Sequence, residues 1–187
     1  MEECGFALFD TAIGRCGIAW SGAGLIGVQL PEASDALAGR RLAKRFPGAV
    51  AGQPTEAAIA AIARITAFLA GALDDDFTTL VLNESGVGAF ERAVYRETRA
   101  IPAGATSTYG AIATTLGDVR DSRRVGQALG RNPWPIVIPC HRVTGVGGWM
   151  GGFSAPGGRA TKLKLLELEG ALAAETLPLF APSAPNP

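Results

Sequence analysis

The chain has 187 residues and no net formal charge at pH 7. Its length allows one domain or two small ones, and no apolar run reaches the roughly 20 residues needed to cross a bilayer, so we expect no membrane partner. The charge is uneven, because residues 1–90 carry 6 basic and 10 acidic side chains, whereas residues 91–170 carry 11 and 6. The basic second half leaves a nucleic-acid partner open.

The cysteines and the first residues indicate the compartment. Cys4, Cys16 and Cys140 are sparse and odd in number, which is typical of a reducing compartment and argues against a disulfide framework. The start Met-Glu-Glu-Cys lacks the basic stretch of a secretion signal. We therefore expect a cytoplasmic protein with a free thiol at Cys140.

The first half of the chain is predicted to be a small sheet followed by helices. Short apolar runs at residues 6–9, 17–20 and 25–30 are separated by glycines, which predicts an antiparallel meander. Helices are predicted at residues 32–45 and 56–73. Asp74, Asp75 and Asp76 then close this unit as a linker or solvated turn; a metal site is the weaker alternative, because no spaced partner accompanies them.

The second half is predicted to be mostly helical. A helix over residues 87–100 stops before Pro102, and short helices over residues 109–116 and 122–130 bracket a turn at residues 117–119, which is the spacing of a helix-turn-helix. The fold class is thus α+β, with an N-terminal α/β domain over residues 1–85 and a mostly helical domain over residues 86–170. Residues 171–187, which contain four prolines, are predicted to be a disordered tail.

The second helix of this pair has features suited to DNA. Arg123 and Arg124 stand at its start, and Gly126, Ala128 and Gly130 keep it narrow enough to approach a phosphate backbone closely. The alternative is that these small residues allow tight packing in the interior.

The only histidine, His141, directly follows Cys140. A thiol becomes a strong nucleophile only as the thiolate, and a free cysteine with a pKa of about 8.5 needs help at neutral pH. The prolines of residues 132–135 predict extended backbone before Cys140, which would direct the two side chains to opposite faces and favour a bridging water between them. The alternative is a buried apolar cysteine beside a core histidine.

The run Ile138-Pro-Cys-His-Arg-Val143 resembles the active-site signature of the O6-alkylguanine-DNA alkyltransferases, also called methylated-DNA–protein-cysteine methyltransferases. The resemblance extends over residues 87–170, and its ordered motifs are more specific than a Cys-His pair alone. The further matching positions are Ile101–Gly104, Thr108–Gly110, Arg123, Val125, Gly126, Asn132, Pro133, Gly151–Ser154 and Leu165–Gly170.

The resemblance implies direct reversal of DNA damage. The alkyl group of an O6-alkylated guanine, flipped out of double-stranded DNA, is transferred irreversibly to Cys140, so each molecule acts once; activity on O4-alkylthymine stays open. Glu169 orients His141, His141 takes the thiol proton through a water, and Tyr109 donates a proton to the leaving guanine or, alternatively, only packs as an aromatic ring. No cofactor is implied, and we expect a monomer without an obligate protein partner.

The resemblance also assigns residues to DNA and to the base. Arg123 enters the base stack in place of the extruded nucleotide, while Asn132 ties the recognition helix to the active-site segment. The remaining expected DNA contacts are Thr108, Arg124, Gly126 and Ala128. The remaining expected pocket residues are Trp134, Pro135, Met150, Gly151, Gly152, Phe153 and Ser154.

The chain departs from the family pattern in two places. Phe153 replaces a tyrosine of some relatives, and residues 154–159 form a longer segment. Some relatives bind zinc in the N-terminal domain, but this N-terminal half has only Cys4 and Cys16 and no histidine, so we expect no metal.

Two rival functions remain: a sensor that binds alkylated bases without repairing them, and a cysteine hydrolase acting on an acyl substrate.

Overall fold

The computed structural model describes residues 4–172. Its first part is a sheet with strand order β3-β2-β1-β4, and β1, β2 and β3 are antiparallel neighbours, which confirms the predicted meander. β4, which the sequence did not predict, pairs in parallel with β1. The strands are β1 (Gly5–Thr11), β2 (Gly14–Ser21), β3 (Gly24–Gln29) and β4 (Val50–Ala51).

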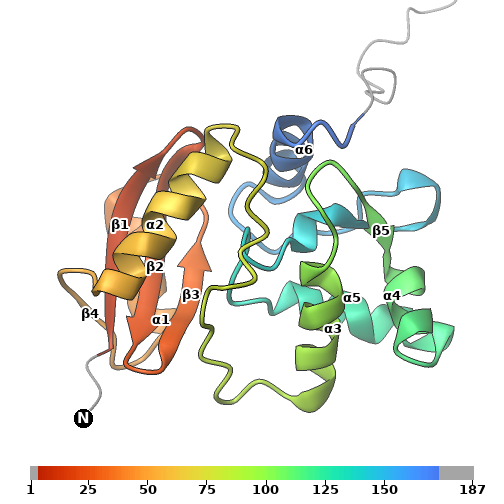
Figure 1. The fold of residues 1–187 in the computed structure, drawn as a ribbon, viewed down its shortest axis with the longest axis horizontal. Helices are drawn as coiled ribbons and strands as arrows, with labels where there is room; N and C mark the ends of the chain where they lie inside the picture. Colours follow the sequence, from red (N-terminus) through yellow and green to blue (C-terminus); the bar gives the residue numbers. More distant parts are fainter. Residues whose placement is uncertain (1–3, 173–187) are drawn as a thin grey trace, which may run out of the picture.

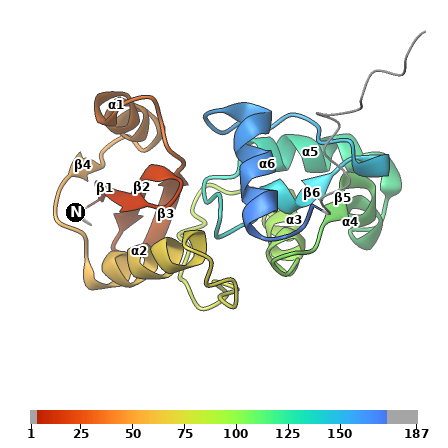
Figure 2. The ribbon, with the colours of Figure 1, turned by 90° about the horizontal axis from the view of Figure 1, so that it is seen from above.

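Two helices cover opposite faces of this sheet, α1 (Asp35–Arg45) and α2 (Glu56–Leu69) (Figures 1 and 2). The side chain of Ser34 accepts a hydrogen bond from the backbone N–H of Leu37, so α1 begins later than predicted. The helix α2 ends four residues earlier than predicted, just before Gly71, whose φ of 107° is incompatible with a continuing helix.

The acidic run after α2 is a structural turn. Asp75 accepts hydrogen bonds from Arg64 Nε at 2.6 Å and from the backbone N–H of Phe77 at 2.7 Å. Its carboxylate is therefore occupied in holding the chain where it leaves the helix. Within residues 4–172, no three His, Cys, Asp or Glu side chains are grouped closely enough to hold a metal ion.

The second part is mostly helical, and the α+β class is confirmed. The helices α4 and α5, joined by a 3₁₀ turn, form the predicted helix-turn-helix, and α3 packs against α5 (Figure 1). The elements are α3 (Ala89–Arg99), β5 (Ser107–Thr108), α4 (Tyr109–Thr115), η1 (Val119–Asp121), α5 (Ser122–Gly130), η2 (Cys140–Arg142), β6 (Val143–Thr144), η3 (Val146–Gly148) and α6 (Gly158–Leu168).

A short parallel ladder brings the later motifs together. β5 pairs with β6, with Ser107 opposite Val143 and Thr108 opposite Thr144 (Figure 2). Tyr109 follows β5 directly, and the Cys140 turn directly precedes β6. Because the ladder is parallel and only two residues long, it brings Tyr109, just after one end, and the Cys140 turn, just before the other, close together although they are 31 positions apart in the sequence.

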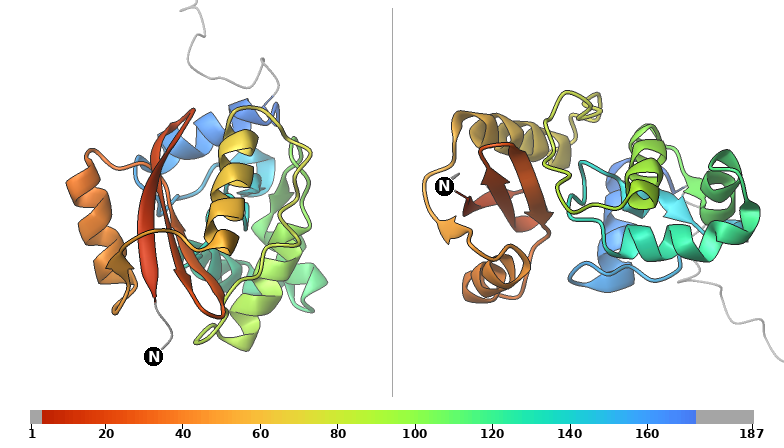
Figure 3. Two further views of the ribbon diagram at one scale, coloured as in Figure 1. Left: turned by 60° about the vertical axis from the view of Figure 1, so that its left-hand side comes forward. Right: turned by 90° about the horizontal axis from the view of Figure 1, so that it is seen from below.

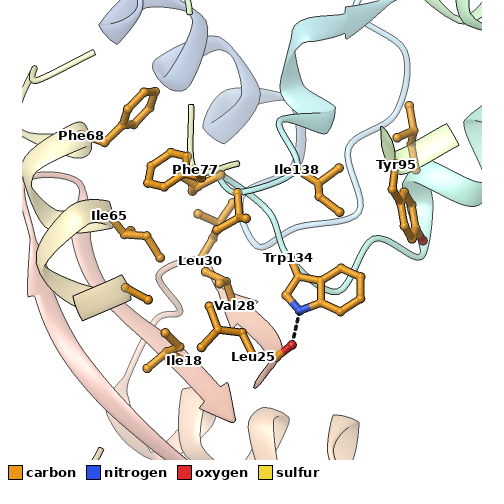
Figure 4. Close-up of a cluster of buried hydrophobic side chains, with 14 of the residues drawn as sticks. Ile18, Leu25, Val28, Leu30, Ile65, Phe68, Phe77, Tyr95, Trp134 and Ile138 are labelled. Atoms are coloured by element: carbon orange, nitrogen blue, oxygen red, sulfur yellow. Dashed lines mark hydrogen bonds between the residues drawn. The ribbon is translucent and has the colours of Figure 1, made fainter. Parts of the chain in front are cut away.

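The two parts lie side by side, as the right-hand view of Figure 3 shows, and hydrogen bonds join them. The backbone N–H of Val28 donates to the carbonyl oxygen of Pro133 at 2.8 Å, and the indole Nε1 of Trp134 donates to the carbonyl oxygen of Leu25 at 2.8 Å (Figure 4). One buried hydrophobic cluster includes residues of both parts. The edge of the N-terminal sheet therefore supports the segment that leads to Cys140.

The domain boundary near residue 85 stays a prediction. The predicted disordered tail lies mostly outside the described residues, which end at residue 172. No helix among those described is both long and apolar enough to span a membrane.

Candidate active site

The segment before Cys140 is a compact turn rather than the predicted extended strand. Asn132 organises it: its side-chain Nδ2 donates to the carbonyl oxygen of Ile138 at 2.8 Å, and its Oδ1 accepts from the backbone N–H of Trp134 at 2.9 Å. Ile136 is held at φ 74°, a conformation that costs a β-branched residue of order 1–3 kcal/mol. The compact turn is thus held by the bonds that the Asn132 side chain makes.

Cys140 begins the 3₁₀ turn η2 and is partly exposed. It lines a small cavity of about 50 Å³ together with Asn132, Pro135, Phe153 and Ser154. Burial raises the pKa of the Cys140 thiol, and the opposing influences of the Asn132 side chain and the Lys162 charge do not cancel it. The thiol is therefore protonated at neutral pH, and a nucleophilic role requires a base.

His141, which directly follows Cys140, is buried and faces the carboxylate of Glu169. Its Nε2 lies 2.7 Å from Glu169 Oε1, and Arg142 donates to the same carboxylate from Nε at 2.8 Å and from Nη2 at 2.9 Å. Burial alone would raise the pKa of Glu169, but the hydrogen bonds from His141 and Arg142 lower it to about 2. Glu169 is therefore an anion across the physiological range.

The charge on Glu169 fixes the form of the imidazole. Burial lowers the pKa of His141, against the influence of Glu169, so the ring is neutral at pH 7. A carboxylate only accepts hydrogen bonds, so the single ring proton must sit on Nε2. The other nitrogen, Nδ1, is buried and has no hydrogen-bond partner among the described residues, and its lone pair is available to accept a proton.

Lys162 is a buried cation that the sequence reading missed. Its ammonium donates to the carbonyl oxygens of Val143 at 2.6 Å and Met150 at 2.7 Å, so α6 is tied to the strand after Cys140 and to the glycine-rich loop. Burial lowers the pKa of Lys162 to about 8. The signal was in the sequence, because Lys162, Leu165, Leu166 and Glu169 recur at helical spacing on one buried face.

Arg45, from the last turn of α1, is a second residue that the sequence reading missed. Its Nη2 donates to the backbone carbonyl of Asn132 at 2.6 Å, and its side chain lines the Cys140 cavity. The N-terminal part therefore contributes a cation to the wall of the active-site cavity. Nothing local in the sequence marks this contact, which joins residues 87 positions apart.

A larger cavity of about 640 Å³ lies beside the Cys140 cavity, within the usual range for ligand pockets. Phe153 and Ser154 line both spaces. Tyr109 lies in its wall, half-buried, and burial raises the pKa of its phenol, so the hydroxyl is a neutral donor at pH 7. The remaining lining residues are Ser122, Arg123, Gly126, Gln127, Gly130, Trp149, Gly151 and Gly152.

The expected DNA contacts are only partly on one surface. Arg123 is exposed at the cavity wall, and Gly126 lies against the Tyr109 ring, where an added Cβ would approach it to 3.7 Å. Arg124 is instead paired with Asp121 at 2.9 Å and lies over the Phe90 ring. Its guanidinium is thus already engaged by protein groups.

Two further expected DNA contacts have structural tasks. Ala128 is fully buried, and its carbonyl accepts from the Tyr95 hydroxyl at 3.0 Å. It therefore packs the interior of α5, as the alternative interpretation of the small residues held. Thr108 caps α4 by accepting from the backbone N–H of Ala111 at 3.0 Å.

Two expected pocket residues lie elsewhere. Trp134 is buried in the core, where it donates to Leu25 and meets the Tyr95 ring edge-on at 6.1 Å between centroids (Figure 4). Met150 is half-buried and contributes its backbone carbonyl to Lys162, and it lines neither cavity. The sequence could not predict this position of Trp134, because its hydrogen-bond acceptor, Leu25, lies 109 positions away in the sequence.

The site thus joins a partly exposed thiol, a neutral imidazole oriented by a carboxylate, and a helix-turn-helix that borders the adjoining cavity. This combination defines a protein that pairs cysteine nucleophile chemistry with a nucleic-acid-binding motif. Comparison with known proteins refines this class.

Residues 89–171 match the family described as 6-O-methylguanine DNA methyltransferase, DNA binding domain. The methylated-DNA–protein-cysteine methyltransferase of Mycolicibacterium paratuberculosis is 40% identical over 120 residues, which cover 64% of this chain and 70% of the relative. The Mycobacterium tuberculosis protein of the same name is 37% identical over 134 residues, covering 72% and 73%.

Solved structures agree. The crystal structure of Mycobacterium tuberculosis OGT in complex with DNA has a TM-score of 0.72 and 30% identity, covering 89% of this chain and 92% of that chain. The O6-methylguanine-DNA methyltransferase of Pyrococcus kodakaraensis has a TM-score of 0.67 and 28% identity, covering 89% and 99%. The chain belongs to the methylated-DNA–protein-cysteine methyltransferase family, which confirms the resemblance and the enzyme class inferred from the sequence.

Proposed function

We propose that the protein repairs DNA by direct reversal, moving the alkyl group of an O6-alkylated guanine to Cys140 in a single irreversible step. The observation that carries this proposal is the hydrogen-bonded set His141, Glu169 and Arg142 beside a partly exposed thiol. It supplies a neutral imidazole with its proton fixed on Nε2 and its Nδ1 free to act as a base.

The reaction is a displacement at carbon. His141 takes the Cys140 proton through a water, the thiolate forms a bond to the alkyl carbon, and the bond between that carbon and guanine O6 breaks. The electron pair stays on guanine, which takes a proton from the Tyr109 hydroxyl; transfer of the His141 proton through solvent then restores the phenol. The products are guanine and a thioether, which water does not readily hydrolyse, so each molecule acts once.

The base must leave the duplex for this reaction, because O6 of a stacked, paired guanine cannot reach a thiol that lines a small cavity. Extrusion costs a few kcal/mol, and less for a damaged pair. We infer that the base enters the 640 Å³ cavity beside α5, with Arg123 occupying the gap in the stack. Gly151, Gly152 and Ser154 would offer polar groups to the guanine edge, with Phe153 as an apolar wall, while Pro135 would wall the adjoining Cys140 cavity.

Analysis of the DNA product tests the reaction type. A duplex with one O6-methylguanine is incubated with excess protein and digested to nucleosides. The proposal predicts loss of O6-methylguanine with an equal gain of guanine, no abasic site and no strand break. A protein that binds the lesion but leaves the modified nucleoside intact would be a sensor, and hydrolysis of activated esters dependent on Cys140 would indicate a hydrolase; either result contradicts the proposal.

A further inference from the structure

A tryptophan in the glycine-rich loop is exposed beside the larger cavity. Trp149 follows η3 and is 67% exposed, whereas Trp20 is 4% exposed and Trp134 is 1% exposed. Exposed large aromatic side chains are frequent at binding sites, where an apolar face and a polar edge are both used. Trp149 was not among the expected site residues.

Glycines on both sides hold the indole against its own loop. The backbone N–H of Gly145 donates to the carbonyl oxygen of Trp149 at 2.6 Å, and a Cβ at Gly145 would meet the Trp149 ring at 2.7 Å. A Cβ at Gly151 would lie 3.4 Å from the Trp149 ring and 3.0 Å from the Tyr109 hydroxyl. Gly151 therefore separates the two aromatic residues, and both border the same cavity.

The cavity has the chemistry of a stacking site. Tyr109, Trp149 and Phe153 supply three aromatic side chains, and Arg123 supplies a cation from α5. Aromatic faces stack on nucleobases with little regard to sequence. Trp149 lines only the larger cavity, whereas Cys140 lines only the smaller one, so the indole is placed to touch a base rather than the alkyl group that reacts.

We propose that Trp149 is a positioning residue that stacks on the extruded guanine at the mouth of the cavity. This inference rests on the proposed function and adds a residue to it. Trp149 stabilises the base outside the duplex and does not change the reactivity of the thiol. Its loss should slow transfer from duplex DNA and from a free O6-alkylguanine base alike, in contrast to the loss of Arg123, which fills the stack of the duplex only.

Fluorescence gives a readout that does not depend on transfer. Trp20 and Trp134 are buried, so changes in quenching by acrylamide report chiefly on Trp149. In a Cys140→Ala background, a duplex with one O6-methylguanine should shift the emission and protect it from acrylamide, whereas the same duplex without the lesion should do so weakly. A Trp149→Phe variant in that background should lose the response.

Kinetics test the role in repair. Trp149→Ala should lower the second-order rate constant of methyl transfer by roughly 5- to 150-fold, the range that loss of one base–aromatic stack gives. Trp149→Phe should retain most of the rate. Val146→Ala is the matched control, because Val146 is exposed in the same loop and lines neither cavity. Labelling of Cys140 by iodoacetamide should be equal in all of these proteins.

The outcomes separate this inference from the proposed function. Transfer by Trp149→Ala within two-fold of wild type on both substrates overturns the stacking role, and so does emission that lesion-bearing DNA leaves unchanged. If wild type transfers no methyl group but lesion-bearing DNA still protects Trp149, the proposed reaction fails and the stacking role stands. Equal rate losses in Trp149→Ala and Val146→Ala would indicate damage to the loop and would also overturn it.

Discussion

Replacing Glu169 by glutamine removes the charge at the centre of the active site with almost no change in volume. The carboxylate accepts three hydrogen bonds, from His141 Nε2 and from Arg142 Nε and Nη2. Glutamine has only one acceptor oxygen, and its side-chain NH₂ group, itself a donor, would face the N–H donors of His141 or Arg142. Leaving Arg142 buried without its anion costs about 3–5 kcal/mol, the usual cost of breaking a buried ion pair.

The pKa of Glu169 gives a second estimate of the same quantity. Its fall from 4.5 to about 2 corresponds to about 3 kcal/mol of stabilisation at neutral pH. Because the folded protein holds the carboxylate ionised, this contribution is complete above pH 4.5 and is lost as the pH falls toward 2. The two estimates agree, so Glu169→Gln should lower the free energy of unfolding by about 3–5 kcal/mol at pH 7.

Urea unfolding of wild type and Glu169→Gln from pH 7 down to the acid limit of folding measures this difference. The expected gap narrows below pH 4.5. A gap under about 1 kcal/mol at pH 7, or one that does not change with pH, would refute the assignment of Glu169 as the buried counter-ion.

The same variant tests orientation of His141. With the carboxylate gone, the ring proton is no longer held on Nε2, and transfer should slow by about 10²-fold or more, since general bases contribute about 10²–10⁴-fold. Affinity for DNA should stay nearly unchanged. Arg142→Met is the matched control, because it disrupts the same buried group but leaves the bond between His141 and Glu169. Equal loss of rate in both variants would show that packing, not orientation of His141, is at stake.

Three further changes test other parts of the site. Arg123→Ala should slow transfer from duplex DNA at least ten-fold more than transfer from a free modified base, because only the duplex has a gap to fill; equal losses, measured as rate constants on both substrates, would count against this role. Lys162→Met leaves the carbonyls of Val143 and Met150 without their donor and should lower the unfolding free energy by about 2–4 kcal/mol in denaturant titrations. An unchanged denaturation midpoint would contradict the stabilising role of these two hydrogen bonds. Arg45→Met should slow transfer several-fold by loosening Asn132, whereas Arg40→Met, on the exposed side of the same helix, should not; stopped-flow transfer rates that match in the two variants would exclude the contact.

Much of the fold follows from local signals. The glycines between the first apolar runs predicted the meander of β1, β2 and β3, and the helix-turn-helix followed from its spacing. Errors at helix ends arose where one side chain or one glycine decides the boundary, as Ser34 does for α1 and Gly71 does after α2. These are details of capping, which spacing alone does not determine.

From the residues alone, the site was predictable only where it is continuous in sequence; the distant residues Tyr109, Arg123 and Glu169 came from the family resemblance. Cys140 and His141 are adjacent in the sequence. Lys162 and Glu169 recur at helical spacing on the buried face of α6, but only Glu169 was recognised as a site residue. Contacts between the two parts, such as Arg45 with Asn132 and Trp134 with Leu25, have no local signature. The turn before Cys140 was missed because the Asn132 side chain, which bonds to the backbone of Ile138 and Trp134, decides its shape, and local backbone preferences do not predict such bonds.

The most direct test of the central claim is the mass of the protein after reaction with DNA. Wild type, Cys140→Ala and Cys16→Ala are each incubated with a duplex carrying one O6-methylguanine, and the intact masses and peptides are measured. Cys16 is buried, and burial raises its pKa to about 11, so it is a matched unreactive thiol. The account predicts one methyl group, on Cys140, saturating at one per molecule in wild type and Cys16→Ala and absent in Cys140→Ala. A methyl group on another residue, continued turnover without an adduct, or no adduct despite lesion-selective binding would contradict it.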